Sequence, residues 1–428
     1  MAERLFVVWR LLVLWRIVTI CDGYSFVHSS VEKMYREPRS QSPLCTTRTC
    51  LVMKTRVGIV GLPNVGKSSL FNALARKSIA QSANFPFCTI EPNIAPLPVP
   101  DPYLHDLGEL ANSRRVVPAT MEWIDVAGLV KGASRGEGLG NKFLATVREC
   151  DAICHLIRCY DDPDVIHVDG KVDPIADAEI VNLELLLADL AHVGRRLEKN
   201  TCKGTERSTL EKIEAGLEKG VPARAIGLSE DEKCAIKSMG LLTLKPVVYT
   251  FNVDEVDFMF DRDGIFSRMK KEMRSIQYSD PNTQQYAIVS AKFEAEIASK
   301  SRSEQIDYLS SLDLENHESV ESLLCYNILP SLVQKLLGLS LFYTGPGVSP
   351  ERSQTTKSYL YSKGFNALDV ASRLHGEIQR GFICAEVTNA VTLLKHKSFF
   401  AAKESGCIRT EGKNYPIQSN DVLFIKWT

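Results

Sequence analysis

The chain has 428 residues, of which 44% are hydrophobic and 24% are charged, and its formal net charge is −1. This length predicts two or three domains, and the composition is ordinary for a globular protein. A net charge so close to zero excludes a global field that recruits nucleic acid or an acidic membrane, so any contact with RNA must come from a local patch.

The first 53 residues differ from the rest of the chain. Residues 5–21 are apolar but contain Arg10 and Arg16, which would be costly inside a membrane. With the basic, Ser- and Thr-rich stretch that follows, they have the character of a targeting leader, and a disordered extension or a mispredicted start site is the alternative. We expect the folded protein to begin near Lys54 and to avoid membranes. It would act in the cytoplasm or, if the leader is functional, in a mitochondrion or plastid.

The 12 cysteines contain no repeated C-x-x-C pair. Cys150, Cys154 and Cys159 are the nearest to a cluster, and they fall on an apolar run at 152–157. Buried thiols on a strand are therefore a better interpretation than a zinc site, and the pattern suits a reducing compartment.

A phosphate-binding loop is the most informative motif of the chain. Residues 61–68 (GLPNVGKS) match G-x-x-x-x-G-K-[ST] at every fixed position, between an expected strand at 56–60 and an expected helix at 69–77. Glycines let successive backbone N–H groups point at phosphate oxygens, and the N-terminus of the helix adds positive charge. We expect Lys67 to reach the β- and γ-phosphates and to act in catalysis, and the Ser68 hydroxyl to bind Mg²⁺. The expected nucleotide-binding residues of this segment are Asn64, Val65, Gly66, Lys67, Ser68 and Ser69.

Two further positions predict a magnesium ion. Asp125 lies at the end of an expected strand at 121–126, where P-loop hydrolases place an Asp that holds Mg²⁺ through water. Thr89 lies between the two motifs and would bind Mg²⁺ while the γ-phosphate is present. Gly128 would let a backbone N–H approach that phosphate.

The position that many GTPases fill with a water-orienting Gln is Leu129 here, and no general base is evident. We therefore expect slow turnover. The group that places the attacking water stays open between a backbone group, a residue of a mobile loop, a partner and a K⁺ ion beside Asn64.

A helical segment is expected between residues 179 and 240, where no strand is evident. Apolar residues recur there every three or four positions, which predicts an inserted hairpin of two long helices. The sequence SEDE at 229–232 is a helix-start signal.

Two short motifs follow the insertion and would read the base. GTPases usually carry Asn-Lys-x-Asp after the strand expected at 246–251, and this chain has Asn252, Val253, Asp254 and Glu255. The longer Glu255 side chain would misplace the pair of hydrogen bonds that an Asp accepts from guanine, so we predict that ATP is preferred to GTP. The second motif is Ser290, Ala291 and Lys292, at the end of a strand expected at 286–290.

The expected strands at 57–60, 121–126, 152–157, 246–251 and 286–290 predict an α/β fold with a mostly parallel sheet, which occupies residues 54–178 and 241–337. From 338 to 428, expected strands at 340–344, 358–361, 385–388 and 422–427 surround one helix at 367–380. This pattern predicts a small C-terminal α+β domain.

With these residues in place, the chain resembles the YchF-type Obg-like ATPases of the translation-factor class of P-loop GTPases. The matching segments are residues 61–68, 84–93, 125–134, 136–144 and the Asn-x-x-Glu at 252–255, and the resemblance runs from about residue 55 to the C-terminus. It implies a G domain, an inserted helical hairpin at 179–240 and a C-terminal TGS domain of β-grasp fold. Residues 345–362 depart from the family pattern, which usually has Arg-Ala-Trp there.

The resemblance also implies Mg²⁺-dependent hydrolysis with ATP favoured over GTP, and association with the ribosome through the large subunit or rRNA. We expect a monomer that acts as a regulatory switch. A nucleotide-gated binding module with negligible intrinsic hydrolysis is the alternative, and Leu129 favours it. A small-molecule kinase on a P-loop scaffold is a third reading, which the motifs at 252–255 and 290–292 argue against.

Overall fold

The structure is a computed structural model, and it describes residues 54–82, 93–126, 139–162, 165, 171–199, 202–275, 283–311, 324–345 and 355–428. The expected leader at 1–53 lies outside these residues, as do Thr89, Gly128 and Leu129. None of the helices within the described ranges has both the length and the apolar character that a membrane span requires.

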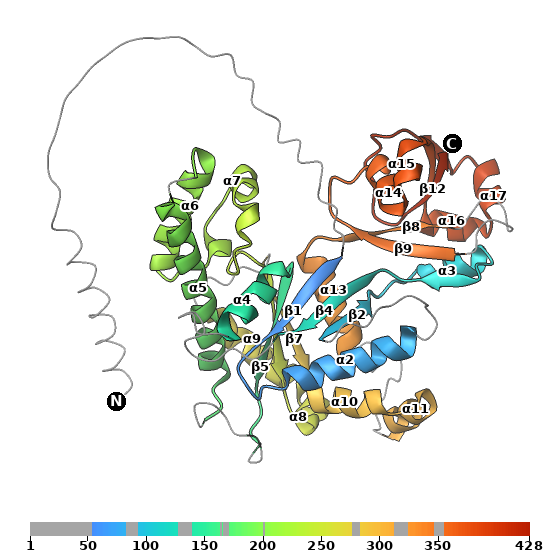
Figure 1. The fold of residues 1–428 in the computed structure, drawn as a ribbon. Helices are drawn as coiled ribbons and strands as arrows, with labels where there is room; N and C mark the ends of the chain where they lie inside the picture. Colours follow the sequence, from blue (N-terminus) through green and yellow to red (C-terminus); the bar gives the residue numbers. More distant parts are fainter. Residues whose placement is uncertain are drawn as a thin grey trace, which may run out of the picture. The chain divides into compact units, whose positions relative to one another are not determined.

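Six strands form the sheet that carries the phosphate-binding loop (Figure 1). Their order across the sheet is β2 (Ile94–Pro98), β4 (Thr120–Asp125), β1 (Thr55–Val60), β5 (Ala152–Arg158), β6 (Val247–Asn252) and β7 (Gln284–Val289). Neighbouring strands pair in parallel except β2, which is antiparallel to β4. The mostly parallel sheet predicted from the sequence is therefore confirmed. The sequence does not predict β2, because its prolines Pro96 and Pro98 conceal the strand pattern.

Helices cover both faces of this sheet (Figure 1). One face carries α2 (Lys67–Ser82), α10 (Ala291–Ser299) and α13 (Cys325–Leu336), and the other carries α4 (Leu139–Glu149), α5 (Pro174–Glu198) and α9 (Arg262–Ser275). All residues of the central strand β5 are buried, as expected for a parallel strand that is covered on both sides. The short helix α8 (Glu255–Phe260) follows β6, and α11 (Arg302–Ser311) follows α10.

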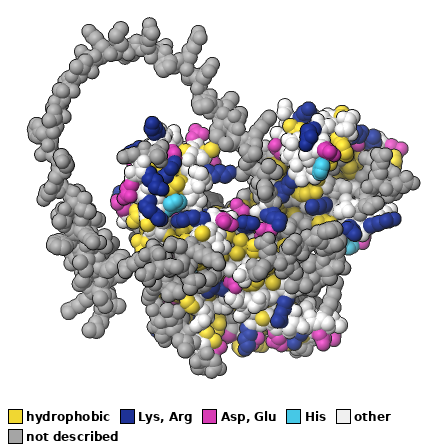
Figure 2. Space-filling view, in the orientation of Figure 1, with side chains coloured by type: hydrophobic (Ala, Val, Ile, Leu, Met, Phe, Trp, Pro, Cys, Tyr) yellow, Lys and Arg dark blue, Asp and Glu magenta, His cyan; other side chains and the backbone are white. Residues whose placement is uncertain are grey.

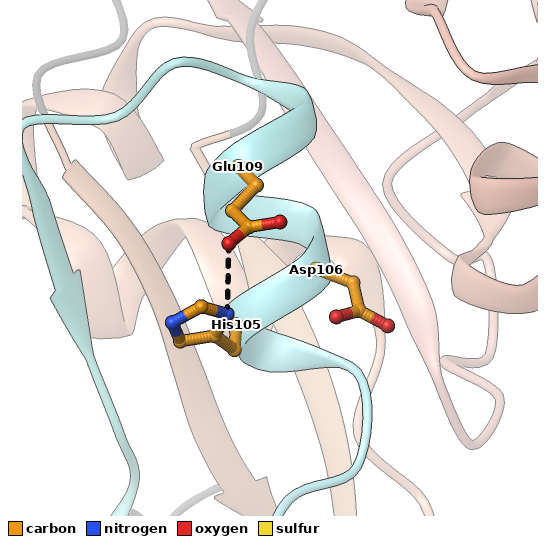
Figure 3. A group of neighbouring side chains, drawn as sticks. All are labelled: His105, Asp106 and Glu109. Atoms are coloured by element: carbon orange, nitrogen blue, oxygen red, sulfur yellow. Dashed lines mark ion pairs between the residues drawn. The ribbon is translucent and has the colours of Figure 1, made fainter.

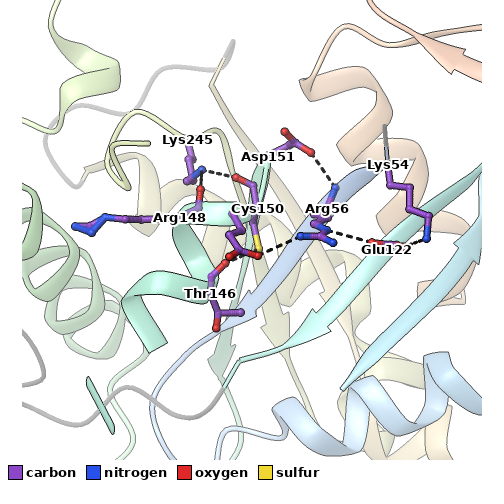
Figure 4. Close-up of polar contacts among 9 residues, drawn as sticks. Lys54, Arg56, Glu122, Thr146, Arg148, Cys150, Asp151 and Lys245 are labelled. Carbon is purple, nitrogen blue, oxygen red and sulfur yellow. Dashed lines mark hydrogen bonds and ion pairs between the residues drawn. The ribbon is translucent and has the colours of Figure 1, made fainter. Parts of the chain in front are cut away.

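A polar network ties the elements together at the amino ends of the strands, away from the phosphate-binding loop (Figure 4). Arg56 of β1 donates to Glu122 of β4 and to Glu149 of α4, at 3.1 Å each. Lys245 Nζ donates to the backbone carbonyls of Arg148 and Cys150, where α4 leads into β5. This network fixes the C-terminal end of α4 against the sheet.

The helical segment predicted between 179 and 240 contains α5, α6 (Thr205–Glu218) and α7 (Glu230–Ala235). Helix α5 already begins at Pro174, because Asp173 caps it by accepting a hydrogen bond from the Ala176 N–H. The helix start expected at Ser229 is present as a capping box with Glu232. The segment has a hydrophobic cluster of its own, which includes Leu186, Val193, Leu210, Ile213 and Leu217.

A second six-stranded sheet occupies the C-terminal part. Its order is β11 (Arg409–Glu411), β10 (Phe382–Asn389), β12 (Asp421–Trp427), β8 (Ser340–Thr344), β9 (Thr355–Tyr361) and β3 (Arg115–Val117). The described residues of this part also form the helices α14 (Ala367–Leu374), α15 (Gly376–Arg380), α16 (Ala390–His396) and α17 (Phe399–Glu404). The single helix expected at 367–380 is therefore two helices, because His375 has an extended backbone and caps α15 with its ring.

Strand β3 comes from the segment between β2 and β4, so the first half of the chain contributes a strand to the second sheet. It pairs in parallel with β9. Residues before and after β3 in the sequence also bond to the second sheet. Tyr343 of β8 donates to Asp101 at 2.8 Å, and the Ala119 N–H donates to Ser358 of β9 at 2.9 Å. Buried apolar residues of both sheets form one continuous cluster.

Candidate nucleotide-binding site

The phosphate-binding loop connects β1 to α2, as its sequence predicts. Asn64 and Gly66 both have positive φ, 62° and 95°, which turns the chain sharply before the helix begins at Lys67. A Cβ atom on Gly61 would lie 2.5 Å from the Leu156 carbonyl oxygen, and one on Gly66 would lie 2.6 Å from Asn252 Nδ2. Glycine is thus required at both positions of the motif.

Lys67 is 7% exposed, and its Nζ donates to the Leu62 carbonyl at 2.7 Å, so the side chain folds back over the loop. Burial lowers the pKa of Lys67 to about 8, and the charge of Asp125 opposes this shift. A desolvated ammonium at the N-terminus of a helix is well suited to an anionic ligand.

The two predicted magnesium ligands that the structure describes lie together. Ser68 Oγ donates to Asp125 Oδ2 at 2.9 Å, and the Asp125 N–H donates to the Asn93 carbonyl at 3.0 Å. A hydroxyl and a carboxylate oxygen are the hard donors that Mg²⁺ prefers, so this pair fits that ion. Thr89, Gly128 and Leu129 lie outside the described residues.

Asn252 connects the phosphate end of the site to the base end. Its Nδ2 donates to the Val65 carbonyl at 2.9 Å, and its Oδ1 accepts from the Ala291 N–H at 2.9 Å. The Asn252 side chain is 2% exposed, so these two hydrogen bonds link the phosphate-binding loop to α10 in the interior of the protein.

The base end is defined by Asp254, Glu255 and Lys292. Asp254 caps α8 by accepting from the Asp257 N–H at 2.7 Å, which leaves the Asp position of the GTPase motif to Glu255. The Glu255 carboxylate lies 3.1 Å from Lys292 Nζ. A hydrogen bond from this ammonium to Glu255, together with the charge of Glu255, raises the pKa of Lys292.

The remaining predicted residues that the structure describes differ in exposure. Val253 is buried, and its N–H donates to the Val289 carbonyl. Ser290 is buried too, and within the described ranges its Oγ has no hydrogen-bond partner. Ser69 is exposed on the first turn of α2. The predicted residues that the structure describes therefore lie at the carboxyl ends of β1, β4, β6 and β7, the edge where open α/β sheets bind ligands.

Sequence reasoning missed Arg158, the last residue of β5, which is also at this edge. The available signal was a charged residue that ends an otherwise apolar run, because such a residue is buried only where its hydrogen bonds are satisfied.

A second group of polar side chains lies on the short helix α3 (Leu104–Leu110), and none of them is a residue of this site (Figure 3). His105, Asp106 and Glu109 each offer a ligand atom within 4.8 Å of the others, and His105 lies 3.4 Å from Glu109. All of them are exposed, and His105 and Glu109 are one helical turn apart, which is sufficient to explain their contact.

The strand order, the loop at 61–68 and the contact between Ser68 and Asp125 define a P-loop protein that binds nucleoside triphosphates. Comparison with known proteins gives the family. The chain belongs to the YchF family.

The family assignment depends on long matches. Ribosome-binding ATPase YchF of Haemophilus ducreyi is 42% identical over 383 residues, which cover 88% of this chain and 99% of that protein. The same-named protein of Bacillus subtilis is 40% identical over 88% of this chain and its whole length, 100%. The solved structure of the Schizosaccharomyces pombe YchF GTPase matches with a TM-score of 0.72 at 32% identity, over 87% of this chain and 98% of that one.

Two family models match separate parts of the chain. A model described as "50S ribosome-binding GTPase" matches residues 56–188. A model of the YchF C-terminal domain, described as "Protein of unknown function (DUF933)", matches residues 342–428.

Proposed function

We propose that this protein is a Mg²⁺-dependent nucleoside triphosphatase that prefers ATP to GTP and acts as a regulatory switch on the ribosome. The observation that carries this proposal is the contact between Ser68 Oγ and Asp125 Oδ2, at 2.9 Å, beside the buried ammonium of Lys67. The names of the Haemophilus and Bacillus relatives, ribosome-binding ATPases, support it.

In this proposal each part of the site has one task. The backbone N–H groups of residues 64–69 and the Lys67 ammonium hold the β- and γ-phosphates. Ser68, Asp125 and Thr89 would hold Mg²⁺, which would act as a Lewis acid and neutralise charge on the phosphates. Lys67 gives up its hydrogen bond to the Leu62 carbonyl when it turns to the ligand.

The preference for ATP depends on Glu255. Asp254 is used as the cap of α8, so only Glu255 is available at the base, and its longer side chain is pulled towards Lys292. Guanine would lose the paired acceptor that an Asp provides, whereas adenine needs none. Titration of the full chain with Mg-ATP and Mg-GTP tests this: tighter binding of GTP by about tenfold or more would contradict it.

Turnover is expected to be slow in the isolated protein, because Leu129 cannot orient water. Hydrolysis of ATP should therefore be measured with and without purified ribosomes, and with KCl against NaCl. Stimulation by ribosomes supports a regulatory ATPase. No hydrolysis in any condition would favour the second candidate, a nucleotide-gated binding module. Equal rates in both salts would contradict a role for a K⁺ ion beside Asn64.

The proposed partner surface belongs to the C-terminal part, which we infer to be a TGS domain contacting the large subunit or rRNA. Figure 2 shows positive and negative side chains interspersed on the face in view, so a contact with RNA would be local. We further propose a monomer, with domains at 54–178 plus 241–337, at 179–240 and at 338–428. Sedimentation of the full chain tests whether it is a monomer. A fluorescent fusion of residues 1–53 tests whether this segment directs the protein to an organelle.

A further inference from the structure

The side chain of Arg158 is buried at the end of the central strand, outside the groups assigned above to the phosphates and Mg²⁺. The residue is 1% exposed, and its guanidinium donates to the backbone of the loop that follows. Nε donates to the Tyr160 carbonyl at 3.0 Å, Nη1 to the Val165 carbonyl at 3.0 Å and Nη2 to the Asp162 carbonyl at 3.2 Å. The guanidinium also lies 4.7 Å over the Tyr160 ring. One planar fork thus fixes the loop at several points.

This loop starts between the phosphate end and the base end of the site. Strand β5 lies between β1, which leads to the phosphate-binding loop, and β6, which leads to Glu255. Arg158 is the register partner of Asn252, and the Cys159 N–H donates to the Asn252 carbonyl at 2.8 Å. The loop is therefore anchored on Asn252, whose side chain also bonds to Val65 and Ala291.

Two residues of the loop interact electrostatically with Lys292, the cation of the ion pair at the base end. Burial raises the pKa of Tyr160, and the positive charges of Arg158 and Lys292 oppose that rise. The Glu255 carboxylate is the main cause of the raised pKa of Lys292, and the charge of Asp162 adds to it. Tyr160 and Asp162 are thus close enough to Lys292 to interact with it electrostatically.

We propose that Arg158 is a positioning residue for recognition of the nucleoside: it holds residues 159–162 and Val165 as one side of the site that receives the base and ribose of the bound triphosphate. The inference rests on the proposed function. Lys67 and Ser68 bind the phosphates from a different loop. A change at Arg158 therefore weakens the binding of the nucleoside and leaves the affinity for the phosphates unchanged.

The test compares Mg-ATP with Mg-tripolyphosphate, which has the phosphates but no nucleoside. Both are titrated into the full chain, into Arg158→Lys and into Arg373→Lys, a matched control that alters an arginine bonded to the Leu360 carbonyl in the second sheet. Lysine keeps the charge but lacks the planar guanidinium that donates to three carbonyls. Arg158→Lys should therefore weaken ATP binding by about tenfold and leave tripolyphosphate binding unchanged. Arg373→Lys should change neither.

Equal loss of both ligands in Arg158→Lys would reveal a merely structural role, and unchanged ATP binding would also overturn the inference. If the wild-type chain bound neither ligand, the proposed function would fail, and this inference with it. Hydrogen exchange on the wild-type chain decides the case in which Arg158→Lys does not fold. Mg-ATP should then slow exchange at the amides of 159–162 more than Mg-tripolyphosphate does, and equal protection would contradict the proposal.

Discussion

The ammonium of Lys67 combines burial with a lowered pKa, of about 8. Below that pH the free protein carries the charge at this position, and above it the amine is neutral. Negative phosphates beside Nζ favour the protonated form and raise the pKa again. Binding of Mg-ATP near pH 8.5, about half a unit above the pKa, should therefore take up a proton, and the affinity should fall as the pH rises through about 8.

Calorimetric titration at that pH, in two buffers with different ionisation enthalpies, measures the proton uptake. Lys67→Gln is the matched control, because it keeps a polar side chain but has no proton to gain. Identical apparent enthalpies for the wild-type chain in both buffers would contradict the role given to this ammonium.

Single residues of the site differ in how far the sequence predicts them. Lys67 and Ser68 are predictable because a motif of fixed spacing imposes the backbone around them. Asp125 is predictable because it ends an apolar run with the pattern of a strand, and in open α/β sheets strand ends meet the ligand. The link made by Asn252 and the loop held by Arg158 are not, because both depend on contacts between strands that are distant in sequence. Thr89, Gly128 and Leu129 stay predictions.

At the scale of elements, Asp189 joins helix α5 to the turn before β6. This fully buried carboxylate accepts from the Leu242 N–H at 3.0 Å, from the Thr243 N–H at 2.7 Å and from Thr243 Oγ1 at 2.8 Å. Asp189→Ala would leave two buried backbone donors without an acceptor and should lower the free energy of unfolding by about 3 kcal/mol.

Chemical denaturation of Asp189→Ala against Asp231→Ala, which removes an exposed carboxylate from α7, measures this effect. Nucleotide affinity should stay the same in both, since neither residue belongs to the site. An Asp189→Ala protein as stable as the control would contradict the anchoring role.

Most elements follow from local patterns, and the exceptions have physical causes. The apolar spacing in α5 and the capping box at Ser229 suffice to predict helices. The break at His375 was missed because residues 367–380 contain no proline and their apolar spacing continues through it. Strands β2 and β3 were missed because one contains prolines and the other is a short segment stabilised mainly by its pairing with β9.

At the scale of the molecule, the two sheets share structure. Strand β3 and the contact between Tyr343 and Asp101 connect the segment between β2 and β4 to the second sheet. From their position in the sequence, residues 115–117 are expected in the first domain. Their pairing with β9 depends on residues far along the chain, so no local pattern in the sequence predicts it. Because buried residues of both sheets form one cluster, we expect the sheets to unfold together.

Tyr343→Phe tests this expectation, because it removes one hydrogen bond to the half-buried Asp101 and should cost about 1 kcal/mol. Hydrogen exchange should then accelerate by a similar factor in β4 and in β8. Tyr361→Phe is the control: its hydroxyl donates to the Ile417 carbonyl within the C-terminal part, so it should accelerate exchange mainly there. Acceleration confined to β8 in Tyr343→Phe would show that the sheets unfold separately.

The most direct measurement for the whole account is equilibrium titration of the full chain with Mg-ATP, in the wild type and in Lys67→Ala. We expect saturable binding by the wild type and a loss of about a hundredfold or more in the variant, because a desolvated ammonium bonded to phosphate is removed. Correctly folded wild-type protein with no affinity for any nucleoside triphosphate, or equal affinities in the two proteins, would contradict the account.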